Sequence, residues 1–158
     1  DSPELTHYRN ELLRRYAANI AVHTTLFDGM DAVLRELEAK HIPWGIVTNK
    51  PRSLSAALLD ALDLTKRCAV LVCPDDVQHP KPDPEPMYLA ASIIGIQPEN
   101  IIYVGDHPRD IDAGRAAGMK TVIAAYGYLP PDLANDLGGW QADYIIQHAS
   151  ELRTLLAI

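Results

Sequence analysis

Apolar residues along this chain recur in two patterns, one typical of amphipathic helices and one typical of short buried strands. Leu5, Tyr8, Leu12 and Tyr16 fall at helical spacing, so a helix is predicted over residues 3–19. The apolar stripe of such a helix needs a second surface to pack against.

The rest of the chain alternates predicted strands with predicted helices. A turn at residues 27–30 leads into a helix that ends near residue 40. Compact apolar runs predict strands at residues 43–48, 69–73, 101–104, 121–125 and 144–146. Helical spacing predicts helices at residues 51–62, 85–94, 109–117 and 149–156. This alternation predicts an α/β fold with a Rossmann-like, doubly wound and mostly parallel sheet.

Polar residues follow two of the predicted strands, at the edge where open α/β sheets place their ligands. Thr48 and Asn49 follow the first strand, where a hydroxyl and backbone amides can hydrogen-bond a phosphoryl oxygen. Asp106 ends the strand at 101–104, and Asp110 follows one helical turn later. Two carboxylates so spaced can face one point, which suits a hard divalent cation.

A proline-rich segment, residues 75–86, supplies a third candidate side chain. Prolines at 80, 82, 84 and 86 rule out a regular helix or central strand and predict an extended loop. Lys81 lies between two of these prolines, so its backbone loses little entropy when it is held in place. Its ammonium group would then neutralise a phosphate and a nearby carboxylate.

Each candidate also has an ordinary structural interpretation. Acidic residues stabilise helix N-termini through the helix dipole, which alone would explain Asp106. Thr48 and Asn49 are residue types that commonly cap helices. Taken alone, Lys81 could equally well be a solvated lysine on the surface. Only the occurrence of all these residues in order along one chain favours a functional site.

Composition excludes several classes of protein. The 158 residues carry a net charge of −7 with only 14 Lys and Arg, which argues against a nucleic-acid partner. No apolar run is long enough for a membrane span, and the polar N-terminus resembles no signal peptide. A 47% hydrophobic content suits one compact domain. We therefore expect a cytoplasmic protein without a membrane partner.

The remaining metal-binding residue types show no metal spacing. Cys68 and Cys73 form neither a CxxC pair nor half of a zinc site, and both are expected in the core. The six histidines lack His-x-x-x-His spacing. Asp75 and Asp76 are expected in a solvated turn.

Three strings occur in an order that resembles motifs II, III and IV of the haloacid dehalogenase (HAD) superfamily, nearest to its phosphoglycolate phosphatase-like branch. They are Val-Thr-Asn-Lys at 47–50, Lys-Pro-Asp-Pro at 81–84 and Tyr-Val-Gly-Asp-His-Pro-Arg-Asp at 103–110. The likeness covers residues 27–158, which are expected to form a HAD-like core domain. Residues 1–26 resemble the remnant of a helical cap.

The resemblance implies roles for the candidate residues. Thr48 would bind the transferring phosphoryl group, with the backbone amide of Asn49 beside it. Lys81 would orient the nucleophile and offset charge. Asp106 would hold Mg²⁺, and Asp110 would complete or orient the metal shell. The implied activity is magnesium-dependent hydrolysis of a small phosphorylated metabolite, phosphoglycolate or a sugar or amino-sugar phosphate, through an aspartyl-phosphate.

The chain departs from the family pattern in two places. Motif I, an Asp-x-Asp-Gly-Thr segment that carries the nucleophile, occurs nowhere in the 158 residues. We therefore expect no turnover by this chain alone, and the alternative interpretation is a non-catalytic phosphate- and metal-binding module. His107 stands where relatives commonly carry Ser or Asp, and it would tune the metal shell or point outward.

The missing segment also has a structural consequence. In HAD proteins the first strand lies at the centre of the sheet, between the strand ending at Thr48 and the strand ending at Asp106. Without it, the edges of residues 43–48 and 101–105 lose a shared hydrogen-bonding partner. We expect this chain either to self-associate through these edges or to be loosely folded there.

Overall fold

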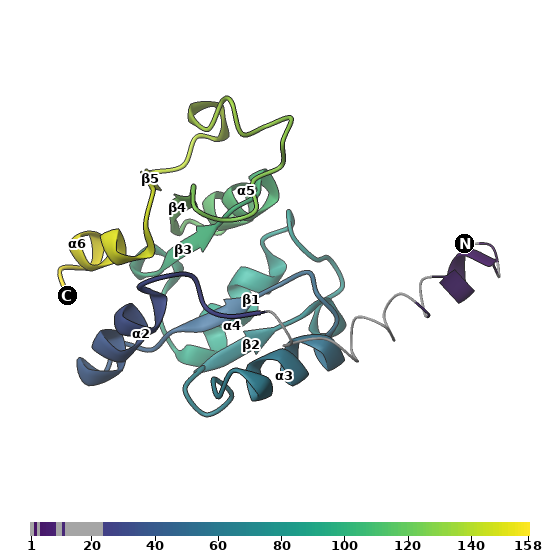
Figure 1. Cartoon of the computed structure of the whole chain (residues 1–158), viewed down its shortest axis with the longest axis horizontal. Coiled ribbons are helices and arrows are strands. Elements are labelled where there is room, and N and C mark those ends of the chain that lie inside the picture. Colours follow the sequence, from purple (N-terminus) through teal and green to yellow (C-terminus); the bar gives the residue numbers. More distant parts are fainter. Residues whose placement is uncertain (1, 3, 9–10, 12–23) are drawn as a thin grey trace.

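A computed structural model of the chain describes residues 2, 4–8, 11 and 24–158. Residues 4–8 and 11 are helical, in agreement with the predicted N-terminal helix. The rest of that predicted helix lies outside the described residues. From residue 24 onward the chain forms an α/β fold (Figure 1).

Helices and strands alternate in the predicted order. The bounds are α2 (Met30–Ala39), β1 (Gly45–Val47), α3 (Arg52–Ala61), β2 (Val70–Val72), α4 (Glu85–Ile94), β3 (Ile102–Gly105), α5 (Pro108–Ala116), β4 (Lys120–Ala124), β5 (Tyr144–Ile146) and α6 (Leu152–Leu156). Prolines at the first or second position start both α4 and α5, where the missing N–H costs nothing. Predicted and observed bounds differ by no more than two residues except in two places.

Both exceptions are single turns of 3₁₀ helix. Pro74–Asp76 forms one that overlaps the start of the segment expected to be extended, residues 75–86, because the Asp76 carboxylate accepts a hydrogen bond from the Cys73 N–H at 2.8 Å. Asp76 also pairs with Arg52, so it is not the purely solvated residue expected from the sequence. The second turn, Ala149–Glu151, replaces the first turn of the predicted C-terminal helix.

The strands form two separate parallel sheets instead of one. β1 pairs only with β2, whereas β3, β4 and β5 pair in that order. The two sheets lie on either side of a space between β1 and β3 (Figure 1). This break lies where a central strand was expected between β1 and β3. The predicted α/β fold class with parallel strands is confirmed.

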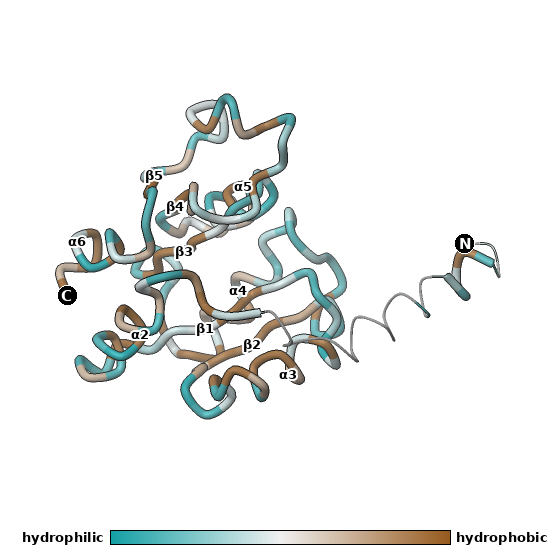
Figure 2. The backbone as a smooth tube through the Cα atoms, in the orientation of Figure 1, coloured by the Kyte–Doolittle hydropathy of each residue, from teal (hydrophilic) through white to brown (hydrophobic). Residues whose placement is uncertain are grey.

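Helices cover both faces of the strands. α4 packs against β1 and β2 and α5 against β3 and β4, around a core that includes Met87 and Ala113. On the opposite face α2 and α6 pack around Val33, Val122 and Leu152. Hydrophobic residues concentrate where strands and helices meet, and hydrophilic residues occupy the outer turns (Figure 2). Within the described residues, no helix has the length and apolar character needed to cross a bilayer.

Candidate functional site

Lys81 is the most enclosed polar side chain at the carboxyl ends of the strands, with 7% of it exposed. Its Nζ donates hydrogen bonds to the Val47 carbonyl at 2.8 Å, to the Tyr103 hydroxyl at 2.8 Å and to Asp110 Oδ1 at 2.7 Å. These partners come from β1, β3 and α5. The ammonium group therefore joins the two sheets across the space between them, and the interpretation as a solvated surface lysine is wrong.

Asp110 is held on both of its carboxylate oxygens. Oδ1 pairs with Lys81, and Oδ2 accepts the His107 N–H at 3.2 Å. A side chain at Gly105 would lie 2.3 Å from the Asp110 Cβ, so only glycine lets this carboxylate pack against the end of β3. Of the two roles that the resemblance implies for Asp110, this geometry favours orienting the site over completing a metal shell.

His107 caps helix α5. Its Nδ1 accepts a hydrogen bond from the Arg109 N–H at 3.2 Å, and its backbone N–H is bound by Asp110. This reciprocal arrangement satisfies two amides at the start of the helix. The local role explains a histidine at this position without a metal.

Thr48 and Asn49 do not cap a helix. Helix α3 begins at Arg52 after Pro51 and has no side-chain cap, whereas the Thr48 hydroxyl accepts the Lys50 N–H at 3.1 Å. The Asn49 amide donates to the backbone carbonyl of Lys81 at 2.9 Å. Thr48 and Asn49 thus shape the turn after β1, and Asn49 fastens the Lys81 loop to that turn.

Asp106 stands at the end of β3, against a different loop. Its Oδ2 accepts the Tyr128 N–H at 2.8 Å. A side chain at Gly127 would come within 2.6 Å of the Asp106 Cβ, so the loop can approach this closely only because residue 127 is glycine. Among the described residues, no hydrogen bond joins Asp106 directly to the Lys81 network.

Tyr103 is a polar member of the site that sequence analysis missed as a functional residue. Its hydroxyl donates to the Val47 carbonyl at 2.9 Å and accepts from Lys81. Burial, and then the charges of Asp110 and Asp106, hold the pKa of its phenol well above the ordinary 10.0. The available signal was one hydroxyl-bearing residue in the otherwise apolar run before Gly105.

The residues at this edge of the sheet fit, in part, the magnesium ion that the resemblance implies. Mg²⁺ is usually held by one or two carboxylates together with waters and substrate phosphates. Asp106 fits this pattern, because within the described part of the chain its Oδ1 makes no hydrogen bond. That same part contains no group of three or more His, Cys, Asp or Glu residues placed to hold a metal. The described residues would therefore supply only part of the shell.

Comparison with known proteins identifies the family. The family model described as "Haloacid dehalogenase-like hydrolase" matches residues 1–124. The chain belongs to the haloacid dehalogenase-like hydrolase family. The HAD resemblance drawn from the three strings is thereby confirmed.

Two curated HAD relatives illustrate the similarity. The N-acetylmuramic acid 6-phosphate phosphatase of Pseudomonas putida is 41% identical over 148 residues, which are 94% of this chain and 66% of the relative. The phosphoglycolate phosphatase of Xanthomonas campestris pv. campestris is 43% identical over 142 residues, which are 90% of this chain and 63% of the relative. The chain thus spans about two thirds of the length of these HAD proteins.

A solved HAD-type structure matches the fold. The crystal structure of a predicted phosphoglycolate phosphatase from Haemophilus somnus superimposes with a TM-score of 0.89 and 24% sequence identity. The match covers 99% of this chain and 68% of that one. At this level of identity the similarity concerns the fold alone.

Proposed function

We propose that this chain carries the phosphate- and magnesium-binding part of a HAD-type phosphatase that hydrolyses small phosphorylated metabolites. The observation that supports this most strongly is the buried ammonium of Lys81, held by Asp110 where β1 and β3 end. A fixed cation in a poorly hydrated site stabilises the developing negative charge of a phosphoryl group without reorganising during the reaction.

The other residues have complementary roles in this proposal. The Thr48 hydroxyl and the Asn49 backbone amide hydrogen-bond the phosphoryl oxygens. Lys81 neutralises charge and orients the attacking group, while Asp110 and Tyr103 keep its ammonium in place. Asp106 would hold Mg²⁺, which when bound spreads the charge of the phosphoryl oxygens.

Turnover needs a nucleophile in addition to these residues. By the family resemblance it is an aspartate on a strand beside β1 and β3. Its carboxylate oxygen would bond to phosphorus as the ester P–O bond breaks, and the departing oxygen would take a proton from the second aspartate of the Asp-x-Asp-Gly-Thr segment, which by the resemblance serves as acid and base. That aspartate would then take a proton from the water that attacks phosphorus, which releases inorganic phosphate and restores the first carboxylate. The side chain of Lys81 reaches from one sheet to the other, so it is placed to orient a group between them.

The relatives' names narrow the proposed substrate class. One acts on N-acetylmuramic acid 6-phosphate and another on phosphoglycolate. Both compounds are phosphomonoesters that also bear a carboxylate. We therefore infer a phosphorylated small organic acid, either phosphoglycolate or an amino-sugar phosphate.

A second candidate function is a phosphate- and metal-binding module that turns nothing over. It is favoured by the network around Lys81, whose hydrogen bonds are complete among the described residues without a nucleophile. The two candidates differ in what happens when a nucleophile is supplied.

The decisive experiment compares two chains in the presence of Mg²⁺. The 158-residue chain should release no phosphate from para-nitrophenyl phosphate, because the covalent step lacks its nucleophile. The same chain preceded by an Asp-x-Asp-Gly-Thr segment should release phosphate from phosphoglycolate or N-acetylmuramic acid 6-phosphate. Failure of the extended, folded chain on both substrates would favour the binding module. Magnesium-dependent release by the short chain that disappears in Lys81→Ala would refute the proposed nucleophile.

A further inference from the structure

Three aromatic side chains gather on one side of the candidate site, next to Asp106. They are Phe27, which precedes α2, and Tyr126 and Tyr128, which follow β4. Between centroids, the Phe27 ring lies 5.1 Å from the Tyr126 ring, edge to face, and 5.7 Å from the Tyr128 ring. Only 6% of the chain is aromatic, so its composition does not explain this gathering. We call these three residues the aromatic cluster.

The inner end of the aromatic cluster is fixed in the protein interior. Tyr126 packs against the hydrophobic core that includes Val33 and Val122, and so does Leu26, the residue before Phe27. Side chains in a close-packed core hold one position. The Phe27 ring therefore rests on a fixed surface and in turn supports the ring of the third member.

The backbone around Tyr128 is fixed as well. The Gly127 N–H donates to the Ala124 carbonyl at 2.9 Å, and the Tyr128 N–H donates to Asp106 Oδ2 at 2.8 Å. The next residue, Leu129, packs against a cluster of buried apolar side chains. Tyr128 is nevertheless 86% exposed. Its ring is thus held outside a well-anchored loop, where a ligand can reach it.

A single exposed aromatic residue is common on protein surfaces and needs no ligand to explain it. Two features distinguish Tyr128 from that ordinary case. Its ring adjoins Phe27, which is itself 40% exposed, so the two rings together present apolar surface. Its backbone N–H binds the carboxylate that would hold Mg²⁺ in the proposed function. The apolar surface therefore begins directly beside the proposed phosphate- and metal-binding residues.

We propose that the aromatic cluster binds the sugar ring of an amino-sugar phosphate, with the face of Tyr128 against the C–H groups of that ring. This inference rests on the proposed function and deepens it, because it selects one of the two substrates considered there. The face of an aromatic ring carries partial negative charge, so it attracts the slightly positive hydrogens of aliphatic C–H groups. Because Tyr128 is already held in place, little of its conformational freedom remains to be lost on binding.

The two candidate substrates differ in what they offer to such a surface. In N-acetylmuramic acid 6-phosphate, one methylene group joins the phosphate to a pyranose ring that has C–H groups on its faces. A phosphoryl group held beside Asp106 therefore leaves the sugar ring close to the residues that adjoin Asp106. Phosphoglycolate is short and ends in a carboxylate, so it has no apolar face to cover an aromatic ring. The aromatic cluster thus favours the amino-sugar phosphate.

Binding to the 158-residue chain in the presence of Mg²⁺ tests the proposal without requiring turnover. Calorimetric titration compares N-acetylmuramic acid 6-phosphate, phosphoglycolate and inorganic phosphate. The amino-sugar phosphate should bind about five- to tenfold more tightly than phosphoglycolate, which is the gain expected from stacking on one aromatic ring. NMR spectra should show upfield shifts of the sugar-ring protons in the complex, because these protons lie over the face of Tyr128.

Substitutions of Tyr128 isolate the contribution of its ring. Tyr128→Ala should remove most of the preference for the amino-sugar phosphate, together with the upfield shifts, and leave the affinities for phosphoglycolate and inorganic phosphate unchanged. Tyr128→Phe keeps the ring and should keep the preference. Both variants retain the backbone N–H that binds Asp106. Tyr144→Ala is the matched control, because Tyr144 is also exposed but begins β5, at the opposite edge of the sheet. It should change none of the three affinities.

Three results would overturn the proposal while phosphate binding persists. The first is equal affinity of the parent chain for the two phosphomonoesters. The second is an equal loss of affinity for all three ligands in Tyr128→Ala, which would mean that this residue only shapes the loop. The third is a dimer of the parent chain that becomes a monomer in Tyr128→Ala by light scattering, which would identify a second copy as the occupant. Failure of the parent chain to bind any of the three ligands would instead refute the proposed function, and this inference with it.

Discussion

Strands β3 and β4 lie side by side but differ in burial. In β4, Thr121, Val122 and Ile123 are each 0% exposed, whereas all four residues of β3 are only half-buried. β1 resembles β3, with no buried residue. The sequence of β3 is at least as apolar as that of β4, so its hydrophobicity does not explain the difference.

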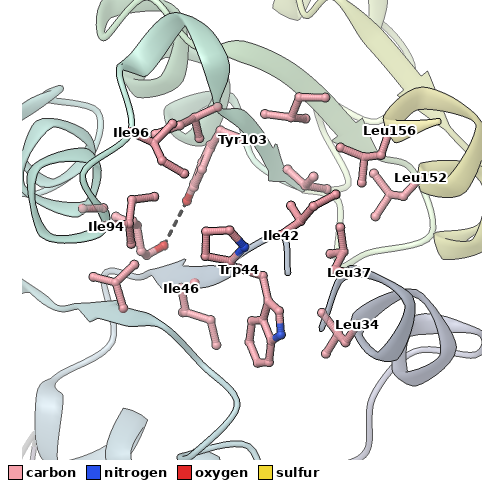
Figure 3. A pocket seen from close by; sticks show the side chains of 18 of the residues that line it. Leu34, Leu37, Ile42, Trp44, Ile46, Ile94, Ile96, Tyr103, Leu152 and Leu156 are labelled. Atoms are coloured by element: carbon pink, nitrogen blue, oxygen red, sulfur yellow. Dashed lines mark hydrogen bonds between the residues drawn. The ribbon is translucent and has the colours of Figure 1, made fainter. Parts of the chain in front are cut away.

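The difference lies in the number of neighbouring strands. β4 pairs on both sides, while β1 and β3 each pair on one side and on the other border the apolar cavity of about 470 Å³ between them, here called the slot (Figure 3). An internal strand of a parallel sheet is buried only when strands flank it and helices cover both faces. The strands next to the candidate site are thus apolar enough for the centre of a sheet but have the exposure of edges.

The largest expected effect comes from breaking the link across the slot. Lys81→Ala leaves the Asp110 carboxylate buried without its cation and should lower the free energy of unfolding by about 3 to 5 kcal/mol. Lys120→Ala is the matched control, because Lys120 forms an ion pair of the same length with Asp143 but is 60% exposed. It should cost less than about 1 kcal/mol. Urea unfolding of both variants measures the difference, and equal losses would contradict it.

One substitution in each strand tests the difference in burial between β4 and β3. Ile123→Ala in β4 removes a fully buried side chain and should lower the free energy of unfolding by about 3 to 4 kcal/mol. Ile102→Ala in β3 removes a side chain already adjoining the slot and should cost about 1 to 2 kcal/mol. A loss at Ile102 as large as that at Ile123 would mean that the slot is closed in solution.

Substitutions at the polar carboxyl ends of the strands are expected to change the affinity for Mg²⁺. Asp106→Asn should weaken Mg²⁺ binding roughly tenfold or more, because Asp106 directly follows β3 and, within the described part of the chain, its Oδ1 makes no hydrogen bond and can bind a ligand. Asp75→Asn should leave the affinity unchanged, since Asp75 binds the Arg52 N–H at the surface. Calorimetric titration of both variants decides the question. Similar losses, or no binding by the parent chain, would refute the metal assignment.

The smallest expected effect is a dependence of stability on alkaline pH. Burial raises the pKa of Tyr103, so its contribution to stability is fully present below the ordinary value of 10.0 and falls as the pH rises above it. The loss from this one group is at most about 1.4 kcal/mol per pH unit. Tyr103→Phe should flatten the loss between pH 10 and 11 in urea unfolding. Tyr128→Phe, at an 86% exposed position, should leave it unchanged.

Local patterns in the sequence predicted most elements well. α4 and β5 have the predicted bounds, because Pro84 and Pro86 fix the start of α4, Gly95 ends it, and Tyr144–Ile146 is a compact apolar run. The turn at Pro74–Asp76 closes through a local hydrogen bond from the Cys73 N–H to Asp76, but Asp76 is also held by Arg52, which is 24 residues away. No local pattern contains that contact.

For the candidate site, the sequence predicted where several of its residues lie along the fold but not which residues they bind. Thr48, Lys81 and Asp106 follow from the ends of strands and a proline-rich loop. The bond between Lys81 and Asp110 joins residues 29 positions apart, and the bond between Tyr103 and Val47 joins residues 56 apart. Asp110 was predicted beside a metal on the basis of helical spacing. Spacing alone does not reveal that this buried carboxylate pairs with Lys81.

The position of the Lys81 contacts has a mechanical consequence. Among the described residues, these polar contacts cross the slot near the carboxyl ends of β1 and β3, whereas Ile42 and Ile101, near the opposite ends, line it with apolar side chains. Ionic and hydrogen-bonded contacts resist displacement through their directionality, but apolar surfaces slide and separate more easily. We therefore expect the two sheets to rotate relative to each other, with the contacts of Lys81 acting as the hinge. The distance between them would vary most at the far end, while Thr48 and Asp110 keep a nearly constant separation.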